Sequence, residues 1–572
     1  MRARLASGFV LLVSVPAVLS GGGARLSASA PFGEAKTVNT RLGAVASATP
    51  EATAVGAAVL AAGGNAVDAA VATAFALAVT YPPAGNLAGG GFAVGRTPGG
   101  DLWALDFRET APAGTWRDSF LGPHGKARRG ASTRGGLSVG TPGTVRGLEV
   151  LHRRYGKLPW ARLVAPAVRL ARAGFRVPRG LSRTLAEYAA DLARDAEASR
   201  LFLPGGKPLP AGALLVQEDL ARTLEAIASG GADAFHRGPI ARAIAVFVRS
   251  TGGVLTEEDL AGYRPEWRPP FVFDDGRFRL VTMPLPSSGG FLLASILGQL
   301  RFVRGAIDDR DAPETLHLVA EAERRAYADR NRFLGDTGCV DVPLAALLVP
   351  ARLAALGFSI DPARATPSSS IEGGAWPREP DQTTHYVTAT ADGGAVSVTY
   401  TLNDTLGNRS VVPGVGVLLN NEMDDFAVEP GAANAYGLVQ GEPNAVRAGG
   451  RPLSSMTPTI VLEDGRPRFV LGSPGGGTIP TTVLQVYLNA ARRGEPLGEA
   501  VAARRFHHQH LPDRIELEGG AFPGDVKAAL RAKGHALSIG GKLGYVHAIA
   551  FENDGSLTAV ADPRGYGAAA GP

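Results

Sequence analysis

The first strong hydrophobic pattern of the chain's interior is a long apolar stretch at 53–81, whose only charged residue is Asp68. Gly63-Gly64-Asn65 interrupts this stretch with residues typical of a helix end. The pattern therefore predicts two buried helices rather than one membrane helix, over 54–62 and 66–80. Pro82-Pro83 ends the second of them, because proline cannot continue a helix.

The hydrophobic period changes along the rest of the chain. Between 140 and 350 apolar residues recur mainly at helical spacing, most clearly in 145–155, 163–173 and 315–333. Residues 361–382 are rich in Pro, Ser, Gly and acidic residues, which is typical of an exposed, mobile linker. After it strand signals dominate, at 385–390, 395–401, 411–419, 457–462, 467–472, 514–518 and 544–552, with helices predicted at 478–493 and 523–533.

The N-terminus has the layout of a secretory signal peptide. Arg2 and Arg4 precede an apolar run from Leu5 to Leu19, and small residues follow up to a possible cleavage site at Ala28-Ser29-Ala30. The run is short for a membrane span. We therefore expect export to a bacterial periplasm or to the medium, with no membrane span once the signal is removed.

Composition excludes several classes of protein. The formal net charge is +5 over 572 residues, without a dense basic run interleaved with aromatics, so nucleic-acid binding is not indicated. Cys339 is the one cysteine, which excludes an intrachain disulfide framework and a cysteine-based metal cluster. No metal or cofactor is expected.

A predicted hairpin places polar side chains around Thr383. Its strands, 384–390 and 395–401, are joined across Asp392-Gly393-Gly394, a strong turn signal. A two-residue turn sets Thr384 opposite Thr401, and a three-residue turn shifts the pairing by one. In both registers Thr401 and Asn403 lie within a residue or two of Thr383. Threonine pairs are common between strands, so the hairpin alone defines no site.

Three further segments could carry chemistry. Arg108 stands where a predicted strand meets a loop, a favourable place for a functional side chain, although this position alone favours an ordinary surface or salt-bridged arginine. The acids and amides of 420–425 could hold a cation or a substrate ammonium, or form a solvated turn. Gly475-Gly476-Gly477 precedes the helix at 478–493, where free N–H groups could bind a phosphate or an oxyanion.

Taken together and in this order, the motifs of the chain resemble those of the γ-glutamyltransferase family, also called γ-glutamyl transpeptidase or glutathione hydrolase. The resemblance runs from about residue 40 to the C-terminus. The segments that carry it are Gly63-Gly64-Asn65-Ala66-Val67-Asp68, Gly85-Asn86-Leu87, Asp106-Phe107-Arg108-Glu109, Pro286-Ser287-Ser288-Gly289-Gly290, Thr383-Thr384-His385-Tyr386, Asn420-Asn421-Glu422-Met423-Asp424-Asp425-Phe426, Pro452-Leu453-Ser454-Ser455-Met456 and Gly475-Gly476.

The resemblance implies an α+β fold, the four-layer αββα sandwich of the N-terminal nucleophile hydrolases. It implies a precursor that cuts itself between Gln382 and Thr383 and leaves two chains that stay together. The resulting parts are a signal peptide (1–30), a largely helical large subunit (31–382) and a β-rich small subunit (383–572). The freed α-amino group of Thr383, with a reference pKa of about 7.7–8.0, would serve as the local base.

The resemblance also implies the roles of the site residues. Thr383 would attack the γ-amide of glutathione or another γ-glutamyl compound and pass the acyl group to water, an amino acid or a peptide. Thr401 would support Thr383, and Gly475 and Gly476 would form the oxyanion hole. Arg108, Ser454 and Ser455 would bind the α-carboxylate of the donor. Asn403, Glu422 and Asp425 would bind its α-ammonium. Tyr436 is a candidate lid residue.

Two alternatives remain open on the sequence. A glutaryl-cephalosporin acylase shares the scaffold, but a glutaryl group lacks the α-amine that Glu422 and Asp425 would bind. A catalytically silent binding homologue is disfavoured by the intact Thr383 and Thr401. The chain departs from the family pattern at Asn408-Arg409, where a small or hydroxyl residue is usual, and an arginine there could alter acceptor preference.

Overall fold

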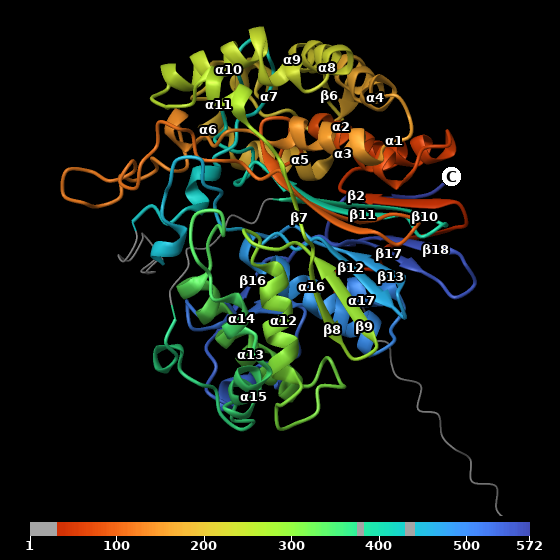
Figure 1. The fold of residues 1–572 in the computed structure, drawn as a ribbon, viewed down its shortest axis with the longest axis vertical. Coiled ribbons are helices and arrows are strands. Elements are labelled where there is room, and N and C mark those ends of the chain that lie inside the picture. The colour runs from red at the N-terminus through yellow and green to blue at the C-terminus, as the bar shows by residue number, and fades with distance from the viewer. Residues whose placement is uncertain (1–30, 374–382, 430–440) are drawn as a thin grey trace, which may run out of the picture.

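The computed structural model describes residues 31–373, 383–429 and 441–572. The expected signal peptide, Gln382 and Tyr436 lie outside these ranges. Helices and antiparallel sheets form four layers, with one helical layer on each side of two stacked sheets, so the predicted αββα sandwich is confirmed (Figure 1).

Both central sheets of the described chain have seven antiparallel strands. The order in the first is β1 (Lys36–Thr40), β18 (Leu557–Ala561), β17 (His547–Phe551), β13 (Arg466–Leu471), β12 (Thr459–Glu463), β9 (Phe278–Thr282) and β8 (Phe271–Asp275). The order in the second is β19 (Ala568–Ala570), β2 (Gly43–Ser47), β10 (Thr384–Thr390), β11 (Ala395–Thr401), β3 (Gly90–Arg96), β4 (Leu102–Asp106) and β7 (Glu266–Arg268). Each sheet therefore combines strands from before and after residue 383.

Side-chain alternation in β10 and β11 decides which way the site faces. Tyr386, Val398 and Tyr400 pack toward the outer helices, whereas Val387 and Ala389 belong to the core between the sheets. Since successive strand residues point to opposite faces, Thr383 and Thr401 share the inter-sheet face with Val387 and Ala389.

The outer layers are helices with apolar faces. The second sheet is covered by α1 (Pro50–Ala61) and α2 (Ala66–Thr80), the two buried helices predicted from the sequence. Asn65 caps α2 by accepting from the Asp68 N–H at 2.9 Å, while the Asp68 carboxylate accepts from the Asn65 N–H. The first sheet is covered by α12 (Gly289–Leu300), α13 (Pro313–Phe333) and α16 (Ile479–Tyr487) (Figure 1).

Two details of the sequence-based interpretation change. The predicted strand at 411–419 is wrong: the segment folds back on itself, with an isolated bridge between Val411 and Leu418 and a Val412 N–H to Val417 O bond of 3.0 Å. Gly414 and Gly416 allow this reversal because both adopt positive φ. The hairpin pairs Thr384 with Tyr400, so the register is the one expected for the longer turn.

The glycines of 85–92 lie in close contact with neighbouring backbone. A Cβ on Gly89 would lie 2.0 Å from the Thr401 carbonyl oxygen, and one on Gly91 would lie 2.4 Å from that of Thr399. These glycines let β3 lie directly against β11. Among the described residues, no helix is long and apolar enough to cross a membrane.

Candidate active site

Thr383 stands at the start of β10 and is 5% exposed. The last pair of the β10–β11 register is Thr384 with Tyr400, so the next position along it sets Thr401 opposite Thr383. Both line a small cavity of about 10 Å³, the room of about one water molecule. The cavity is lined by Arg108, Thr383, Thr401, Asn403, Asp425, Ser454, Met456, Gly476 and Ile479. The structure therefore gathers most of the predicted site residues in one place, and it adds Met456 and Ile479.

Arg108 is the buried cation of the site. It follows β4, and its backbone N–H donates to Asp106 Oδ1 at 2.9 Å. Its guanidinium lies 2.5 Å from Glu422 Oε1 and also pairs with Asp425 Oδ2. Burial opposes the charge, but the neighbouring carboxylates outweigh it and hold the pKa of Arg108 above its ordinary value.

The sequence predicted a cation and carboxylates that hold opposite ends of a zwitterion, and in the structure these charged groups contact one another directly. Burial raises the pKa of Glu422 well above its usual range, although Arg108 works against this shift. Glu109, whose carboxylate lies 3.9 Å from Arg108, has its pKa raised to about 7, again chiefly by burial. The site thus holds more buried carboxyl groups than Arg108 can neutralise, which favours one of them being protonated.

The loop that carries Glu422 and Asp425 is buried, so it is not the solvated turn considered from the sequence. Asn420 fixes the loop by accepting from the N–H groups of Gly140 and Glu422 and by donating to backbone carbonyls. Asp424 turns to Ser132, whose hydroxyl donates to it at 2.5 Å. Of the three acids in the cluster, Glu422 and Asp425 therefore face Arg108.

A second loop places Ser454 and Ser455. The Ser454 N–H donates to Pro286 O at 2.8 Å, and the Ser288 N–H donates to Ser454 O at 2.7 Å. The Pro286–Gly290 motif therefore supports this loop. Ser455 Oγ accepts from Arg330 of α13 at 2.8 Å, a contact that sequence reasoning missed.

The glycine loop before α16 presents free donors to the cavity. Gly475 and Gly476 have φ of 134° and 53°, a region that favours glycine. Neither backbone N–H donates a hydrogen bond within the described chain. Thr478 holds the Gly475 carbonyl through its Oγ, at 2.8 Å, and its N–H, at 3.0 Å. Together with the N-terminus of α16, these N–H groups favour a negative charge beside Gly476.

Asn403 joins Thr401 to the acid loop. Its N–H donates to Thr401 Oγ1 at 2.8 Å, and its side-chain amide donates to Asn421 O at 3.0 Å. Its φ of 76° turns the chain out of β11 and into the cavity wall.

Asn408 and Arg409, the departure from the family pattern, do not line the cavity. The Arg409 guanidinium lies 4.4 Å from the ring centre of Tyr188 and pairs with Asp191 at 3.1 Å and Asp404 at 2.5 Å. Burial raises the pKa of Asp404 to about 6. Arg409 therefore links the segment after β11 to the helical layer.

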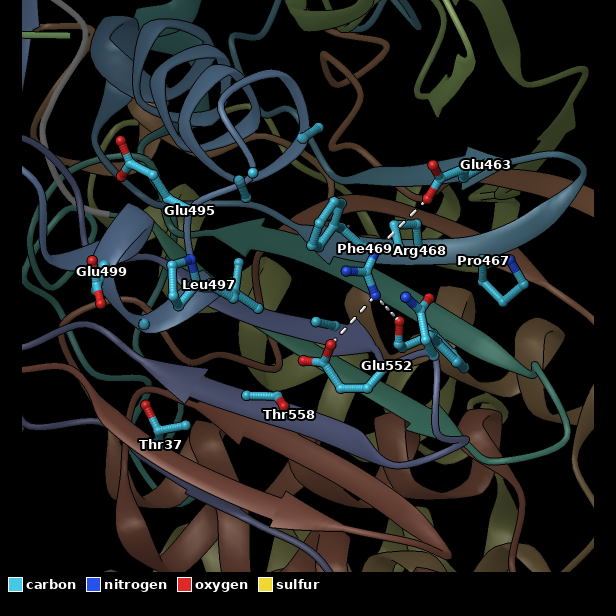
Figure 2. Close-up of a pocket in the computed structure, with 18 of the residues that line it drawn as sticks. Thr37, Glu463, Pro467, Arg468, Phe469, Glu495, Leu497, Glu499, Glu552 and Thr558 are labelled. Carbon is cyan, nitrogen blue, oxygen red and sulfur yellow. Dashed lines mark hydrogen bonds and ion pairs between the residues drawn. The ribbon is translucent and has the colours of Figure 1, made fainter. Parts of the chain in front are cut away.

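A much larger cleft, of about 1790 Å³, lies beside β1, β13 and β18 of the first sheet (Figure 2). Several of its charged groups pair with one another, as Arg468 does with Glu552 at 3.4 Å and Glu463 at 3.7 Å (Figure 2). None of the predicted site residues lines it. Size alone is therefore a poor guide to the active site here.

The layered fold and a buried threonine at the start of a central strand define an N-terminal nucleophile hydrolase. The Gamma-glutamyltranspeptidase family model matches residues 52–572, and the chain belongs to that family. It is 43% identical to the glutathione hydrolase proenzyme of Escherichia coli (strain K12), over 97% of this chain and 98% of that one.

Solved structures agree on the fold. The cephalosporin acylase from Bacillus halodurans superposes with a TM-score of 0.82 at 26% identity, covering 94% of this chain and 97% of that one. The γ-glutamyltranspeptidase of Helicobacter pylori has a TM-score of 0.57 at 38% identity, covering 59% of this chain and 97% of that one.

Proposed function

We propose that the chain hydrolyses glutathione and related γ-glutamyl compounds and transfers their γ-glutamyl group to amino acids or peptides. The observation that carries the proposal is the cavity itself, where Thr383 meets a buried Arg108–Asp425 pair and the free N–H of Gly476. Nucleophile, zwitterion-binding charges and oxyanion donor thus lie around one space.

Thr383 first cuts the chain, from a position opposite Thr401. Its hydroxyl oxygen adds to the carbonyl carbon of Gln382, and the bond from that carbon to the Thr383 nitrogen breaks. The acyl group is then an ester on Thr383, which water hydrolyses to leave a carboxylate on Gln382 and a free α-amino group on Thr383. With a reference pKa of about 7.7–8.0, this amine can take the hydroxyl proton at neutral pH.

The donor is bound by exchange of ion pairs. Without substrate, Arg108 pairs with Glu422 and Asp425. An α-amino acid inserted between them gives its carboxylate to Arg108, Ser454 and Ser455 and its ammonium to Glu422, Asp425 and Asn403. Each charged group of the site then faces a substrate group of opposite charge. A cavity of about 10 Å³ cannot hold a glutamyl group, so Arg108 and the acids must separate on binding.

In the transfer step the Thr383 hydroxyl oxygen attacks the γ-carbonyl carbon of the donor. The negative charge that develops on the carbonyl oxygen is stabilised by the N–H groups of Gly475 and Gly476. The leaving amine takes the proton held by the Thr383 α-amino group, and a γ-glutamyl ester on Thr383 remains. Water or an acceptor amine then attacks this ester and releases the enzyme.

A glutaryl-selective acylase is the competing activity on this scaffold. Glu422 and Asp425 beside Arg108 favour an α-ammonium donor instead, because a glutaryl group would leave both carboxylates without a cationic partner once its own carboxylate binds Arg108. We also propose that residues 1–30 direct the protein out of the cytoplasm, that they are removed, and that the large and small subunits are 31–382 and 383–572.

Purified protein tests both steps. Denaturing electrophoresis with mass spectrometry should show two chains, the smaller beginning at Thr383, and the Thr383→Ala variant should stay whole. The wild type should release aniline from a γ-glutamyl anilide much faster than from a glutaryl anilide. A Thr383→Ala protein that still splits would overturn the mechanism, and a preference for the glutaryl anilide would overturn the donor class.

A further inference from the structure

We propose that Tyr327 of α13 is a positioning residue that orients the oxyanion donors across the boundary between the two subunits. The inference rests on the proposed function, because it assigns Gly475 and Gly476 to the oxyanion. Tyr327 is 2% exposed, and its hydroxyl donates to the carbonyl oxygen of Gly477 at 2.5 Å. It comes from the segment before the cut, whereas Gly477 comes from the segment after it.

A chain of peptide groups connects this hydroxyl to the cavity. The peptide that joins Gly477 to Thr478 has its carbonyl held by Tyr327, and its N–H donates to Gly475 O at 3.0 Å. The Gly475 carbonyl belongs to the same planar peptide as the N–H of Gly476, a residue that lines the cavity. Fixing the first peptide therefore constrains the orientation of the second.

The glycine loop needs such a restraint. Gly475 and Gly476 lack a Cβ, so the peptide between them can adopt more orientations than it could between other residues unless its carbonyl is held. Thr478 holds it from within the loop, and Tyr327 anchors the Thr478 peptide from outside. Hydrogen-bonded peptides also polarise one another in a buried environment, so the Tyr327 bond should strengthen the Gly476 N–H as a donor.

The Tyr327 ring has its own support. It meets the ring of His507 edge to face, with centroids 5.5 Å apart and planes at 85°. His507 Nδ1 lies 2.9 Å from Thr481 Oγ1 in α16. Packing thus holds the ring in place independently of the hydroxyl, so Tyr327→Phe removes the hydrogen bond to Gly477 O and leaves the ring contacts.

The test compares Tyr327→Phe with Tyr400→Phe. Tyr400 is also buried and its hydroxyl also donates to a backbone carbonyl, that of Ala74 at 3.0 Å, but it faces the outer helices. Removal of a direct oxyanion donor lowers kcat about 10²–10³-fold, so loss of a bond one peptide further back should lower kcat about tenfold. KM should change less than kcat, and Tyr400→Phe should keep the wild-type kcat.

Inhibitor binding distinguishes a positioning role from general destabilisation. A boronic acid that carries the glutamyl group forms a tetrahedral adduct with Thr383 and places an oxygen at the oxyanion position, whereas glutamate binds without this adduct. Tyr327→Phe should weaken the boronate about tenfold and leave glutamate binding within twofold. Equal weakening of both ligands, or an unchanged kcat, would overturn the inference.

Incomplete self-cleavage is measured on the same gels, and kcat is normalised to the cleaved fraction. If Tyr327→Phe fails to accumulate, Thr478→Val removes the Thr478 Oγ contact to Gly475 O and should show the same selective loss of boronate affinity. Kinetics are measured with whichever anilide the wild type turns over. An error in donor class then shows in the wild type, and an error in the Tyr327 role shows only in the variants.

Discussion

Replacing Asp425 with asparagine would remove one negative charge from the cavity and keep the shape of the side chain. Asp425 has a 10% exposed side chain and pairs with Arg108 in the absence of substrate. When a γ-glutamyl donor binds, we expect the same carboxylate to accept a hydrogen bond from the substrate ammonium. The variant therefore tests whether this acid recognises the amine or only neutralises Arg108.

The magnitude follows from the hydrogen bond that is lost. A hydrogen bond to a charged group contributes about 1.5–3 kcal/mol, so kcat/KM for a γ-glutamyl anilide should fall about 10- to 150-fold. A glutaryl donor has no ammonium to lose. In the Asp425→Asn variant the carboxylate of a glutaryl donor has one protein carboxylate fewer to compete with for Arg108. We therefore expect kcat/KM for a glutaryl anilide to stay constant or rise.

Asp424→Asn is the matched control. Asp424 lies in the same turn and is partly buried, but it accepts from Ser132 and does not line the cavity. The ratio of the two kcat/KM values, measured by aniline release, should fall at least tenfold for Asp425→Asn and stay near the wild-type value for Asp424→Asn. An unchanged ratio for Asp425→Asn, or equal changes in both variants, would refute ammonium recognition by Asp425.

Three further outcomes are expected. Thr401→Val removes the hydroxyl opposite Thr383 and should lower kcat for the γ-glutamyl anilide about 10- to 100-fold, whereas Thr401→Ser should restore it. A valine variant with the wild-type kcat would contradict a supporting role for Thr401. Burial raises the pKa of Glu109 to about 7, so the folded protein holds this proton to higher pH than the unfolded chain, and the free energy of unfolding should fall by up to roughly 3 kcal/mol as pH rises from about 4.5 to 7. Glu109→Gln should flatten that decline, and a variant with the wild-type pH profile would show that Glu109 does not cause it. Arg409→Leu leaves Asp191 and Asp404 without this partner and should lower the free energy of unfolding by about 1–3 kcal/mol. KM for the donor should stay within twofold of the wild-type value, and a large rise in that KM would place Arg409 in the active site.

Local sequence signals were enough for the parts of the site that lie close together in the chain. The Asp-Gly-Gly turn fixes the hairpin, and the hairpin alone brings Thr401 to Thr383. The run of glycines before a predicted helix likewise predicted free backbone N–H groups at Gly475 and Gly476. These features depend on turn chemistry and backbone conformation, which a short stretch of sequence determines.

Features that depend on distant contacts were not predictable in the same way. Residues 411–419 have the apolar composition of a strand, yet they find no partner strand and fold back through Gly414 and Gly416. In the sequence Tyr327 is indistinguishable from any other aromatic residue on the face of a helix. The packing of α13 against the glycine loop brings its hydroxyl to the carbonyl of Gly477, 150 residues away in the chain. Periodicity reveals which side of a helix is buried but not what lies against it.

Resemblance to a family supplied the charge pattern of the site, but not its arrangement before substrate binds. The direct pairing of Arg108 with Glu422 and Asp425 follows from burial, because a guanidinium removed from water needs carboxylate partners close by. The sequence shows that these groups exist, whereas the fold sets their distance.

The mixed origin of the strands in both sheets has a consequence for the life of the mature protein. A single precursor chain can fold as an intramolecular process, with β2 and β3 already tethered to β10 and β11. Once the chain is cut, unfolding separates two fragments, and neither contains a complete sheet. Recovery then requires the fragments to meet again, so its rate depends on protein concentration and competes with aggregation. The folded heterodimer would therefore persist through a high barrier to unfolding rather than through repeated refolding.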